Sequence, residues 1–385
     1  MAQLVEQRIR NAWVRGSSPR VGSSNLNKSQ IPANRTCLRF LVMKIKRWHL
    51  ILGFVAVVII ALIITVHWMW RGVVGPNFEV SEDTYIYILP TDGEEEILEK
   101  ISTEGKAKSL RGWRLLRRVR PFTPHSGRYV IHPDESVLDV YRRLNQGRQE
   151  PVRLTINSVR TLDRIAGVVG TKLMLDSAAV MQALSDSAFI QDFGYNTATL
   201  PALFIPNTYE MYWDTDINAF MQRMQKENKR FWADKGRDNA AKELGLTHEE
   251  VVTLASIVDE ETAQNAEKPS IAGMYLNRLH KGMMLQADPT VKFSVGDATL
   301  RRIMSTHLET ESPYNTYKVK GLPPGPIRVP SVAGIDAVLH AEKNDYLYMC
   351  AKEDFSGFHN FARTYSEHQQ NARRYQRALN ARGIR

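Results

Sequence analysis

The most regular feature of the chain is one uninterrupted apolar run. It covers residues 50–66, 17 residues without a charge, and Trp68 and Trp70 follow it. A run of this length is the short end of a membrane-spanning helix, and tryptophans beside it are typical of the membrane interface. The alternative is a cleaved signal peptide, but the run is longer than the apolar part of one and no A-x-A cleavage site follows. We therefore predict an uncleaved transmembrane helix over residues 49–70.

The charges on either side of this run predict its orientation. Lys44, Lys46 and Arg47 precede the run, whereas Arg71 and then three acids follow it before residue 84. The positive-inside rule places the more basic side in the cytoplasm. We expect a single-pass protein of the cell (inner) membrane, with a cytoplasmic N-terminus and a C-terminal part that is periplasmic or otherwise extracytoplasmic.

Beyond residue 75, apolar positions alternate in some segments and recur at helical spacing in others, which predicts an α+β protein. A strand is expected within 77–95, and a helical pattern follows that ends in a basic cluster from Arg111 to Arg120. A strand–helix–strand–helix unit is expected over 126–169. We therefore predict a membrane-proximal region at 77–170 and a mixed α+β domain at 171–385.

The distribution of charge argues against one class of function. The 385 residues carry a net charge of +10, and residues 1–48 hold ten basic residues against one acid. The remainder therefore carries about +1, which gives no electrostatic footprint for nucleic acid, and we expect none to bind. Residues 1–48 lack an apolar period and are expected to be disordered or wrongly assigned. The string at 16–26 resembles a translated transfer-RNA gene, so residues 1–42 are interpreted as an artefact and Met43 as the natural start.

The two cysteines predict no crosslink. Cys37 and Cys350 fall on opposite sides of the apolar run and should occupy different compartments, so no intramolecular disulfide is expected. Cys350 lies in an apolar segment that predicts a buried strand, without a neighbouring base that would make it a nucleophile. The sequence holds no H-E-x-x-H or similar cluster, which disfavours a zinc peptidase. We expect neither a metal nor a cofactor.

One glutamate stands on the apolar side of a predicted helix. Thr247 and Glu250 form a capping box that should start this helix. At 100° per residue, Glu261 falls near the middle of the stripe formed by residues 251, 254, 257 and 258, whereas Asp259 and Glu260 project to opposite sides. Burial raises the pKa of a carboxyl group, and a protonated glutamate can donate a proton to a leaving oxygen. The alternative is a glutamate at a helix end that reaches solvent or pairs with an arginine such as Arg278.

Several motifs in fixed order surround this glutamate. They are A-S-I-V-D-E-E-T at 255–262, N-R-L at 277–279, G-M at 282–283, L-Q-A-D-P-T-V at 285–291, S-P-Y-N-T-Y at 312–317 and G-L-P-P-G-P-I at 321–327, with F-I-P-N-T-Y at 204–209 and F-H-N-F at 358–361. Together they resemble the YceG-like endolytic murein transglycosylases of the MltG type. The resemblance covers roughly residues 45–380 and implies a LysM-like module before the catalytic domain. Asp259 and Asn207 depart from residues common in the family, and the second departure weakens any chemical role for position 207.

The resemblance assigns the catalytic role to Glu261. It implies a lyase in which Glu261 protonates the glycosidic oxygen and then accepts the proton of the C6 hydroxyl of N-acetylmuramic acid. That hydroxyl attacks its own C1 and leaves a 1,6-anhydro ring, so a second carboxylate is not needed, unlike in ordinary glycosidases. The implied substrate is nascent peptidoglycan, cut internally between N-acetylmuramic acid and N-acetylglucosamine so that strand growth ends, with peptidoglycan synthases as partners.

Further candidates for contacts with the sugar lie in the loops after Glu261. Gln286, Tyr314 and Asn315 could bind hydroxyl and N-acetyl groups, or could serve turn geometry, above all Asn315. Asp288 could belong to the site or cap a helix with Pro289 at its first position. Gly325 and Pro326 are expected to set the backbone. For His359 we favour a hydrogen-bonded core histidine over a metal ligand.

Two other functions remain open from the sequence. A two-carboxylate peptidoglycan hydrolase would use Glu261 and Asp288 and release reducing-end muramic acid. A non-catalytic, membrane-anchored glycan-binding scaffold would rely on the LysM-like module. A glycan-binding role and a role as a structural spacer are about equally favoured for that module.

Overall fold

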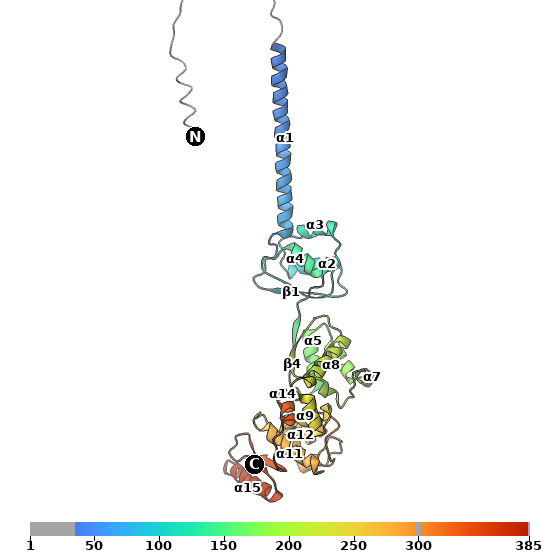
Figure 1. The fold of residues 1–385 in the computed structure, drawn as a ribbon, viewed down its shortest axis with the longest axis vertical. Coiled ribbons are helices and arrows are strands. Elements are labelled where there is room, and N and C mark those ends of the chain that lie inside the picture. Colours follow the sequence, from blue (N-terminus) through green and yellow to red (C-terminus); the bar gives the residue numbers. More distant parts are fainter. Residues whose placement is uncertain (1–34, 298–299, 301, 384–385) are drawn as a thin grey trace, which may run out of the picture. The chain divides into compact units, whose positions relative to one another are not determined.

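A computed structural model describes residues 35–297, 300 and 302–383 (Figure 1). The chain divides into two units after Trp68. The long helix α1, Arg35–Val74, contains the apolar run, and its part from Lys46 to Val74 is long and apolar enough to cross a membrane. Residues 1–34 of the predicted disordered segment lie outside the described residues, but 35–48 are helical. This differs from the prediction because extending an existing helix costs much less than starting one.

The first apolar core of the second unit lies within residues 78–144. Its elements are β1 (Thr84–Ile88), α2 (Glu94–Thr103), α3 (Arg111–Val119), β2 (Gly127–Ile131) and α4 (Val137–Asn145). The strands β1 and β2 are antiparallel, and Ile86 faces Tyr129 on the buried side. Trp113 of α3 closes the core against Phe122 and Tyr141.

A second core spans residues 152–224 and includes Val329. It contains β3 (Val152–Ile156), α5 (Leu162–Lys172), α6 (Ser177–Ser185), α7 (Ser187–Gln191), the 3₁₀ helix η2 (Leu200–Leu203), β4 (Asn207–Met211) and α8 (Ile217–Ala233). The strand, helix, strand and helix expected over 126–169 are confirmed as β2, α4, β3 and α5. They do not form one compact unit, because β2 pairs with β1 whereas β3 pairs with β4. Local alternation specifies a strand but not its partner, and both partners lie outside that window.

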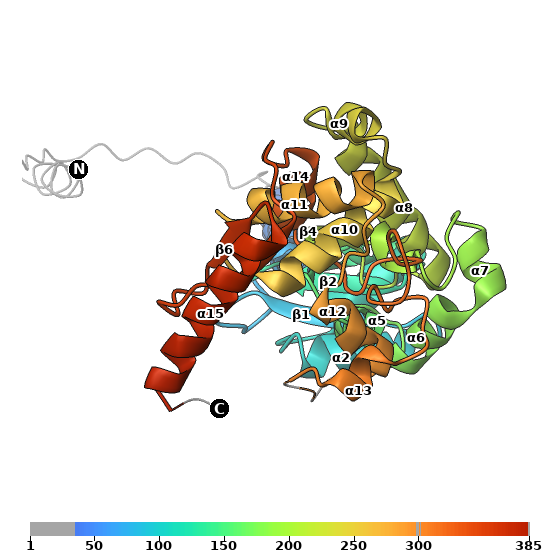
Figure 2. The ribbon, with the colours of Figure 1, turned by 90° about the horizontal axis from the view of Figure 1, so that it is seen from below.

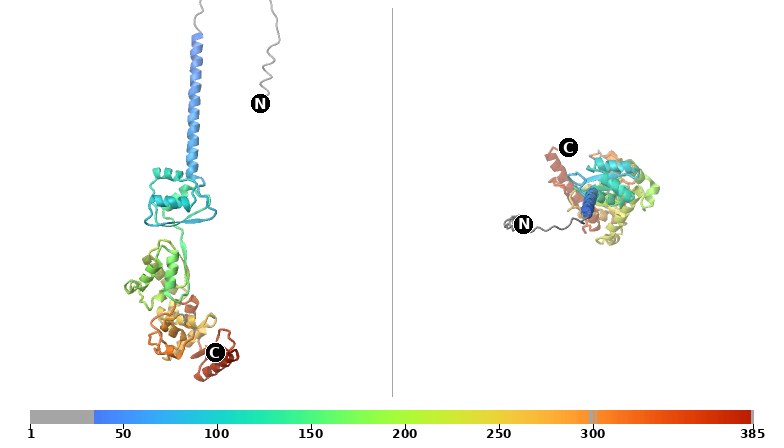
Figure 3. Two further views of the ribbon diagram at one scale, coloured as in Figure 1. Left: turned by 180° about the vertical axis from the view of Figure 1, so that it is seen from behind. Right: turned by 90° about the horizontal axis from the view of Figure 1, so that it is seen from above.

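The third core is mostly helical and holds Glu261 at its edge. It contains α9 (Arg237–Leu244), α10 (His248–Glu261), α11 (Lys268–His280), α12 (Asp288–Val295), α13 (Ser305–Leu308), α14 (Val332–Leu339), β5 (Tyr348–Ala351), β6 (His359–Ala362) and α15 (Tyr365–Ala381). Helix α10 packs between α11, α12 and α14 (Figure 2). The antiparallel pair β5–β6 and α15 lie beside these helices (Figure 3). Mixed helices and short sheets confirm the predicted α+β class.

Candidate active site

Helix α10 presents three consecutive acids at its end. The capping box of Thr247 and Glu250 starts the helix as predicted, and all residues from 251 to 258 are buried. Such a helix is fixed by burial on almost every side, so the directions of Asp259, Glu260 and Glu261 are set by the helical rotation of 100° per residue. The three side chains consequently meet three different environments.

Asp259 is a structural anchor. Its side chain is 3% exposed and lies 2.8 Å from Nζ of Lys268. The Ser331 amide and hydroxyl also donate to it, at 2.5 and 3.0 Å. Ser331 is the N-cap of α14, so Asp259 ties the end of α10 to the start of that helix. A charge this deeply buried is stable only with such partners.

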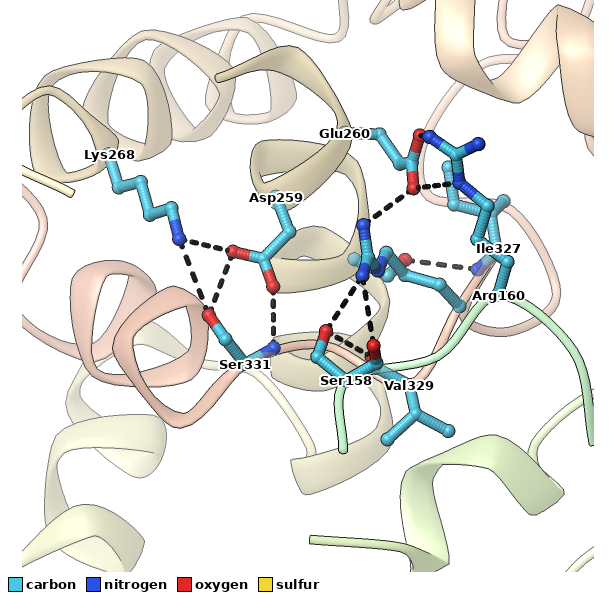
Figure 4. Close-up of polar contacts among 10 residues, drawn as sticks. Ser158, Arg160, Asp259, Glu260, Lys268, Ile327, Val329 and Ser331 are labelled. Carbon is cyan, nitrogen blue, oxygen red and sulfur yellow. Dashed lines mark hydrogen bonds and ion pairs between the residues drawn. The ribbon is translucent and has the colours of Figure 1, made fainter. Parts of the chain in front are cut away.

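Glu260 holds two loops on the other side of α10. It accepts two hydrogen bonds from Arg160, at 2.8 and 2.7 Å, and one from Arg328 at 2.6 Å. Arg328 also donates to the Ser158 hydroxyl at 2.8 Å. Figure 4 shows Asp259 directed toward Ser331 and Lys268, and Glu260 directed away from them toward Arg160. The opposite projections expected for these two acids are confirmed.

The Pro- and Gly-rich segment 321–330 is fixed by its backbone. The Ile327 amide donates to the buried hydroxyl of Ser256 at 3.0 Å, and the Val329 amide donates to the Val159 carbonyl at 2.9 Å. A Cβ atom on Gly325 would lie 2.0 Å from the Ala198 carbonyl oxygen, so only glycine fits. This segment is therefore a rigid loop that is hydrogen-bonded to α10, the helix that carries Glu261.

Glu261 has one side-chain hydrogen-bond partner among the described residues, the hydroxyl of Tyr275, which donates to Oε1 at 2.6 Å. Removal from water raises the pKa of Glu261 from 4.5 to about 7, and the charges of Asp288 and Glu260 act in the same direction. The Tyr275 hydrogen bond and the charge of His359 lower this pKa. Both the protonated and the ionised carboxyl group are therefore accessible near neutral pH, as an acid that must later act as a base requires.

Tyr275 is a fixed donor. It lies on α11 and is buried, and burial raises the pKa of its phenol well above 10, so it keeps its proton. Arg278, the expected alternative partner of Glu261, instead donates to the carbonyls of Leu347, Met284 and Leu285. The alternative of a Glu261–Arg278 ion pair is therefore wrong, because those carbonyls occupy the guanidinium.

Asp288 lies within electrostatic reach of Glu261. It is the first residue of α12, whose N-cap is Ala287, so Asp288 is not the cap that the sequence also allowed. Its exposed carboxylate accepts a hydrogen bond from the Tyr317 hydroxyl at 2.7 Å. Its negative charge contributes to the raised pKa of Glu261.

The three remaining candidates differ in accessibility. Gln286 is exposed and has a left-handed backbone, φ 49°, held by a hydrogen bond from its amide to the Thr316 carbonyl. Tyr314 is half-buried and packs on Phe293 with ring centroids 4.7 Å apart. Asn315 is 0% exposed, and its amide donates to the carbonyls of Leu308 and Thr310. Asn315 thus holds its own loop, which is the turn role left open by the sequence.

His359 is hydrogen-bonded, as favoured from the sequence, but it is only partly buried. Its Nδ1 lies 2.9 Å from Glu267 Oε2, and its amide donates to Oε1 of the same carboxylate at 2.6 Å. Within the described residues, no group of three or more His, Cys, Asp or Glu side chains could hold a metal ion. Cys350 lies on β5 as expected but is only half-buried, and burial raises the pKa of its thiol.

Sequence reasoning missed the groups that hold the acids. Tyr275 has the spacing of an ordinary core residue on α11, and Tyr317 has that of a loop tyrosine. Arg160 precedes Glu260 by 100 residues, so no local pattern could pair them. The one available signal was the quoted motif S-P-Y-N-T-Y, which contains Tyr317.

Comparison with known proteins adds to this geometry. The model of the YceG-like family matches residues 86–374. The chain belongs to the YceG-like family. A protein from Bacillus subtilis (strain 168), named endolytic murein transglycosylase, is 31% identical over 238 residues, which are 58% of this chain and 65% of that protein. A protein of the same name from Streptococcus pneumoniae (strain D39) is 29% identical over 259 residues, 59% of this chain and 46% of that protein.

A solved structure is also similar to this YceG-like chain. The crystal structure of a yceG-like protein from Listeria monocytogenes has a TM-score of 0.50 and 25% sequence identity, and the match covers 76% of this chain and 99% of that one. The matches to the two named transglycosylases each span less than two thirds of those proteins.

Proposed function

We propose that this protein is a membrane-anchored endolytic lytic transglycosylase, a lyase that cleaves nascent peptidoglycan strands. The observation that carries the proposal is Glu261, a single carboxyl group with a pKa of about 7 and a fixed hydrogen bond on one oxygen. That arrangement leaves the second oxygen for a substrate. The names of the two relatives supply the substrate class.

The reaction proceeds in two proton transfers through Glu261. In the first, the protonated carboxyl group gives its proton to the glycosidic oxygen, and the bond from that oxygen to C1 of N-acetylmuramic acid breaks. In the second, the C6 hydroxyl of the same sugar attacks C1 and passes its proton to the Glu261 carboxylate. The products are a free N-acetylglucosamine hydroxyl and a 1,6-anhydro-muramic end, and the enzyme regains its proton. Tyr275 keeps the carboxyl group in one orientation through both steps.

Three side chains are proposed to contact the sugars. Gln286 lies just before α12, Asp288 is the first residue of that helix, and both are exposed, while Tyr314 supplies a partly open aromatic ring. Aromatic faces pack on the apolar faces of sugar rings, and amide or carboxylate oxygens accept from hydroxyl groups. We do not assign a substrate contact to Asn315, because its amide is occupied.

The remaining assignments concern location and partners. The helical span at residues 46–74 anchors the protein in the inner membrane, with the N-terminus in the cytoplasm and the second unit outside. The first core, residues 78–144, is proposed as the LysM-like module. An enzyme tethered beside the site of strand synthesis would end strand growth, and peptidoglycan synthases are its proposed partners.

One observation favours a second candidate, the two-carboxylate hydrolase. The charge of Asp288 acts on Glu261, as in paired carboxylates that share acid and base roles. In that reaction, Asp288 activates water and the cut leaves a reducing muramic acid. The two candidates therefore differ by one water molecule in the mass of the product.

The test uses the full-length protein in detergent, as wild type and as Glu261→Gln. Each is incubated with uncrosslinked peptidoglycan strands, and the products are identified by mass spectrometry. Internal fragments with 1,6-anhydro ends, made by the wild type and absent with Glu261→Gln, are expected. Reducing ends would replace the lyase by the hydrolase, with Asp288→Asn as the next variant. Glycan binding without turnover, under conditions where a control enzyme cleaves, would favour the scaffold.

A further inference from the structure

The basic cluster at residues 111–120 has no part in the candidate site. It contains five arginines and no acid. Most of it forms α3, Arg111–Val119, and the arginine side chains of that helix are largely exposed. By sequence alone such a cluster is usually a solvated surface, because nothing in the local pattern shows what lies next to it.

The structure places the start of α3 against the last turn of α1, and both segments belong to the second unit. A Cβ atom built on Gly112 would lie 2.1 Å from the carbonyl oxygen of Gly72 and 3.4 Å from Cα of Val73. The two backbones therefore touch, which only glycine at position 112 allows. Gly72 follows Trp70 by two residues, or about 3 Å along a helix axis. Trp70 is 66% exposed, and tryptophan is a residue type enriched at membrane interfaces.

Helix α3 has two distinct sides. Trp113 points into the first core and fixes the helix there. Gly112, Leu115 and Val119 share a different stripe, at the spacings i, i+3 and i+7. Val119 at the end of this stripe is 76% exposed and is flanked by Arg118 and Arg120. An exposed apolar residue between arginines is typical of a helix that lies in a membrane interface.

The acids of α2 limit which arginines are available. Arg117 forms an ion pair with Glu94 at 3.0 Å, and Arg114 lines a hollow together with Glu94, Glu95, Glu96 and Glu99. Arg118 and Arg120 have no ion pair among the residues that the structure describes. Arg118 and Arg120 therefore lie at the end of α3 beside the exposed Val119 and are not neutralised by an ion pair with the glutamates of α2.

We infer that α3 rests on the outer surface of the membrane beside the anchor and binds the anionic headgroups of phospholipids through Arg118 and Arg120, with Val119 in the interface. The inference rests on the proposed anchoring of residues 46–74. The contact between Gly112 and Gly72 holds the start of α3 close to the interfacial tryptophan. Arg118 and Arg120 lie about 9–12 Å farther along α3. That distance is comparable with the Debye length of about 8 Å at physiological salt, so their attraction to the headgroups should depend strongly on salt.

The experiment uses the full-length protein in lipid nanodiscs, made of phosphatidylcholine alone or with phosphatidylglycerol. Amide hydrogen exchange is measured for the peptides that cover α3. Two arginines near an anionic surface should slow exchange by about tenfold in the discs with phosphatidylglycerol, and added salt should reverse the effect. Arg118→Gln/Arg120→Gln should abolish the slowing, whereas Arg373→Gln/Arg377→Gln on the exposed side of α15 should retain it.

Two results would overturn the inference. One is equal exchange of α3 in both kinds of disc. The other is slowing by soluble polyphosphate but not by phosphatidylglycerol, which would identify a different anion. Loss of the protein from the discs would overturn the anchoring as well. Strand cleavage by Arg118→Gln/Arg120→Gln is measured in detergent and should equal that of the wild type, so failure of the proposed activity is detected separately.

Discussion

Replacement of Tyr275 by phenylalanine removes one oxygen atom from the candidate site. The hydroxyl group donates to Glu261 Oε1 at 2.6 Å, and the ring is otherwise enclosed by the third core. Phenylalanine fits the same space, so the substitution tests the hydrogen bond rather than the packing. A donor to a carboxylate stabilises the ionised form, so its loss must raise the pKa of Glu261 above its present value of about 7.

The size of the shift follows from the strength of the hydrogen bond. A hydrogen bond to a charged group contributes about 1.5–3 kcal/mol, and one pKa unit corresponds to about 1.4 kcal/mol. Water can replace part of the interaction, because Glu261 is only partly enclosed. We therefore expect an upward shift of about one unit in Tyr275→Phe. Since the first step needs the protonated acid, the alkaline limb of the rate profile should move up by the same amount.

The assay is the pH dependence of kcat/KM for release of 1,6-anhydro products by the full-length protein. The maximal rate should also fall, because the carboxyl group loses its fixed orientation. Tyr209→Phe is the matched control, since Tyr209 is also buried and its hydroxyl donates to a backbone carbonyl, that of Ile205, at 2.5 Å. That control should leave the profile unchanged. An alkaline limb that stays in place or moves down in Tyr275→Phe would refute the proposed role of the hydrogen bond.

Three further substitutions test stability. Folding raises the pKa of Glu261 from 4.5 to about 7, so the wild type loses stability as pH rises through that window. Relative to the wild type, Glu261→Gln should gain up to about 3 kcal/mol in the free energy of unfolding above pH 7, and nothing below pH 4.5. Ser256→Ala leaves the Ile327 amide buried without its acceptor and should cost about 1–3 kcal/mol. Lys268→Met leaves Asp259 without its cation and should cost about 3 kcal/mol, most of which the double substitution with Asp259→Asn should restore.

Urea unfolding measures all three, at two pH values for the first. Ser294→Ala is the control for Ser256→Ala, because its hydroxyl only donates to the Thr290 carbonyl, so its loss leaves no amide unpaired. Equal stability gains of Glu261→Gln at low and high pH would contradict the raised pKa. A double substitution at Asp259 and Lys268 as unstable as Lys268→Met would show that burial of the charge is not the cause.

The sequence could predict the elements that depend on local patterns. Neighbouring residues determine the capping box and the buried stripe of α10, and also the opposite directions of Asp259 and Glu260. The structure confirms all of these. The position of Glu261 on that stripe is equally local. The helical period alone is therefore enough to single out Glu261 as the candidate residue of the site.

What the sequence could not predict depends on distant contacts. The pairing of β3 with β4 joins segments more than 50 residues apart, and the contact of Tyr275 with Glu261 depends on how α11 turns back along α10. The hydrogen bonds from Arg278 to backbone carbonyls also depend on distant contacts, because the third core sets the paths of the loops that carry those carbonyls. Residue types alone left an ion pair with Glu261 equally reasonable.

The three acids at the end of α10 restrict how the length of this helix can change. Asp259 and Glu260 anchor opposite sides, and Glu261 lies between them on the face of Tyr275. Insertion or deletion of one residue between Thr247 and Asp259 would turn all three side chains by 100° and exchange their environments. A change of about seven residues, near two full turns, would restore the directions but would move the acids about 10 Å along the helix axis, away from their partners. Related chains should therefore tolerate substitutions in α10 far more readily than gaps, which makes this helix a fixed point for aligning them.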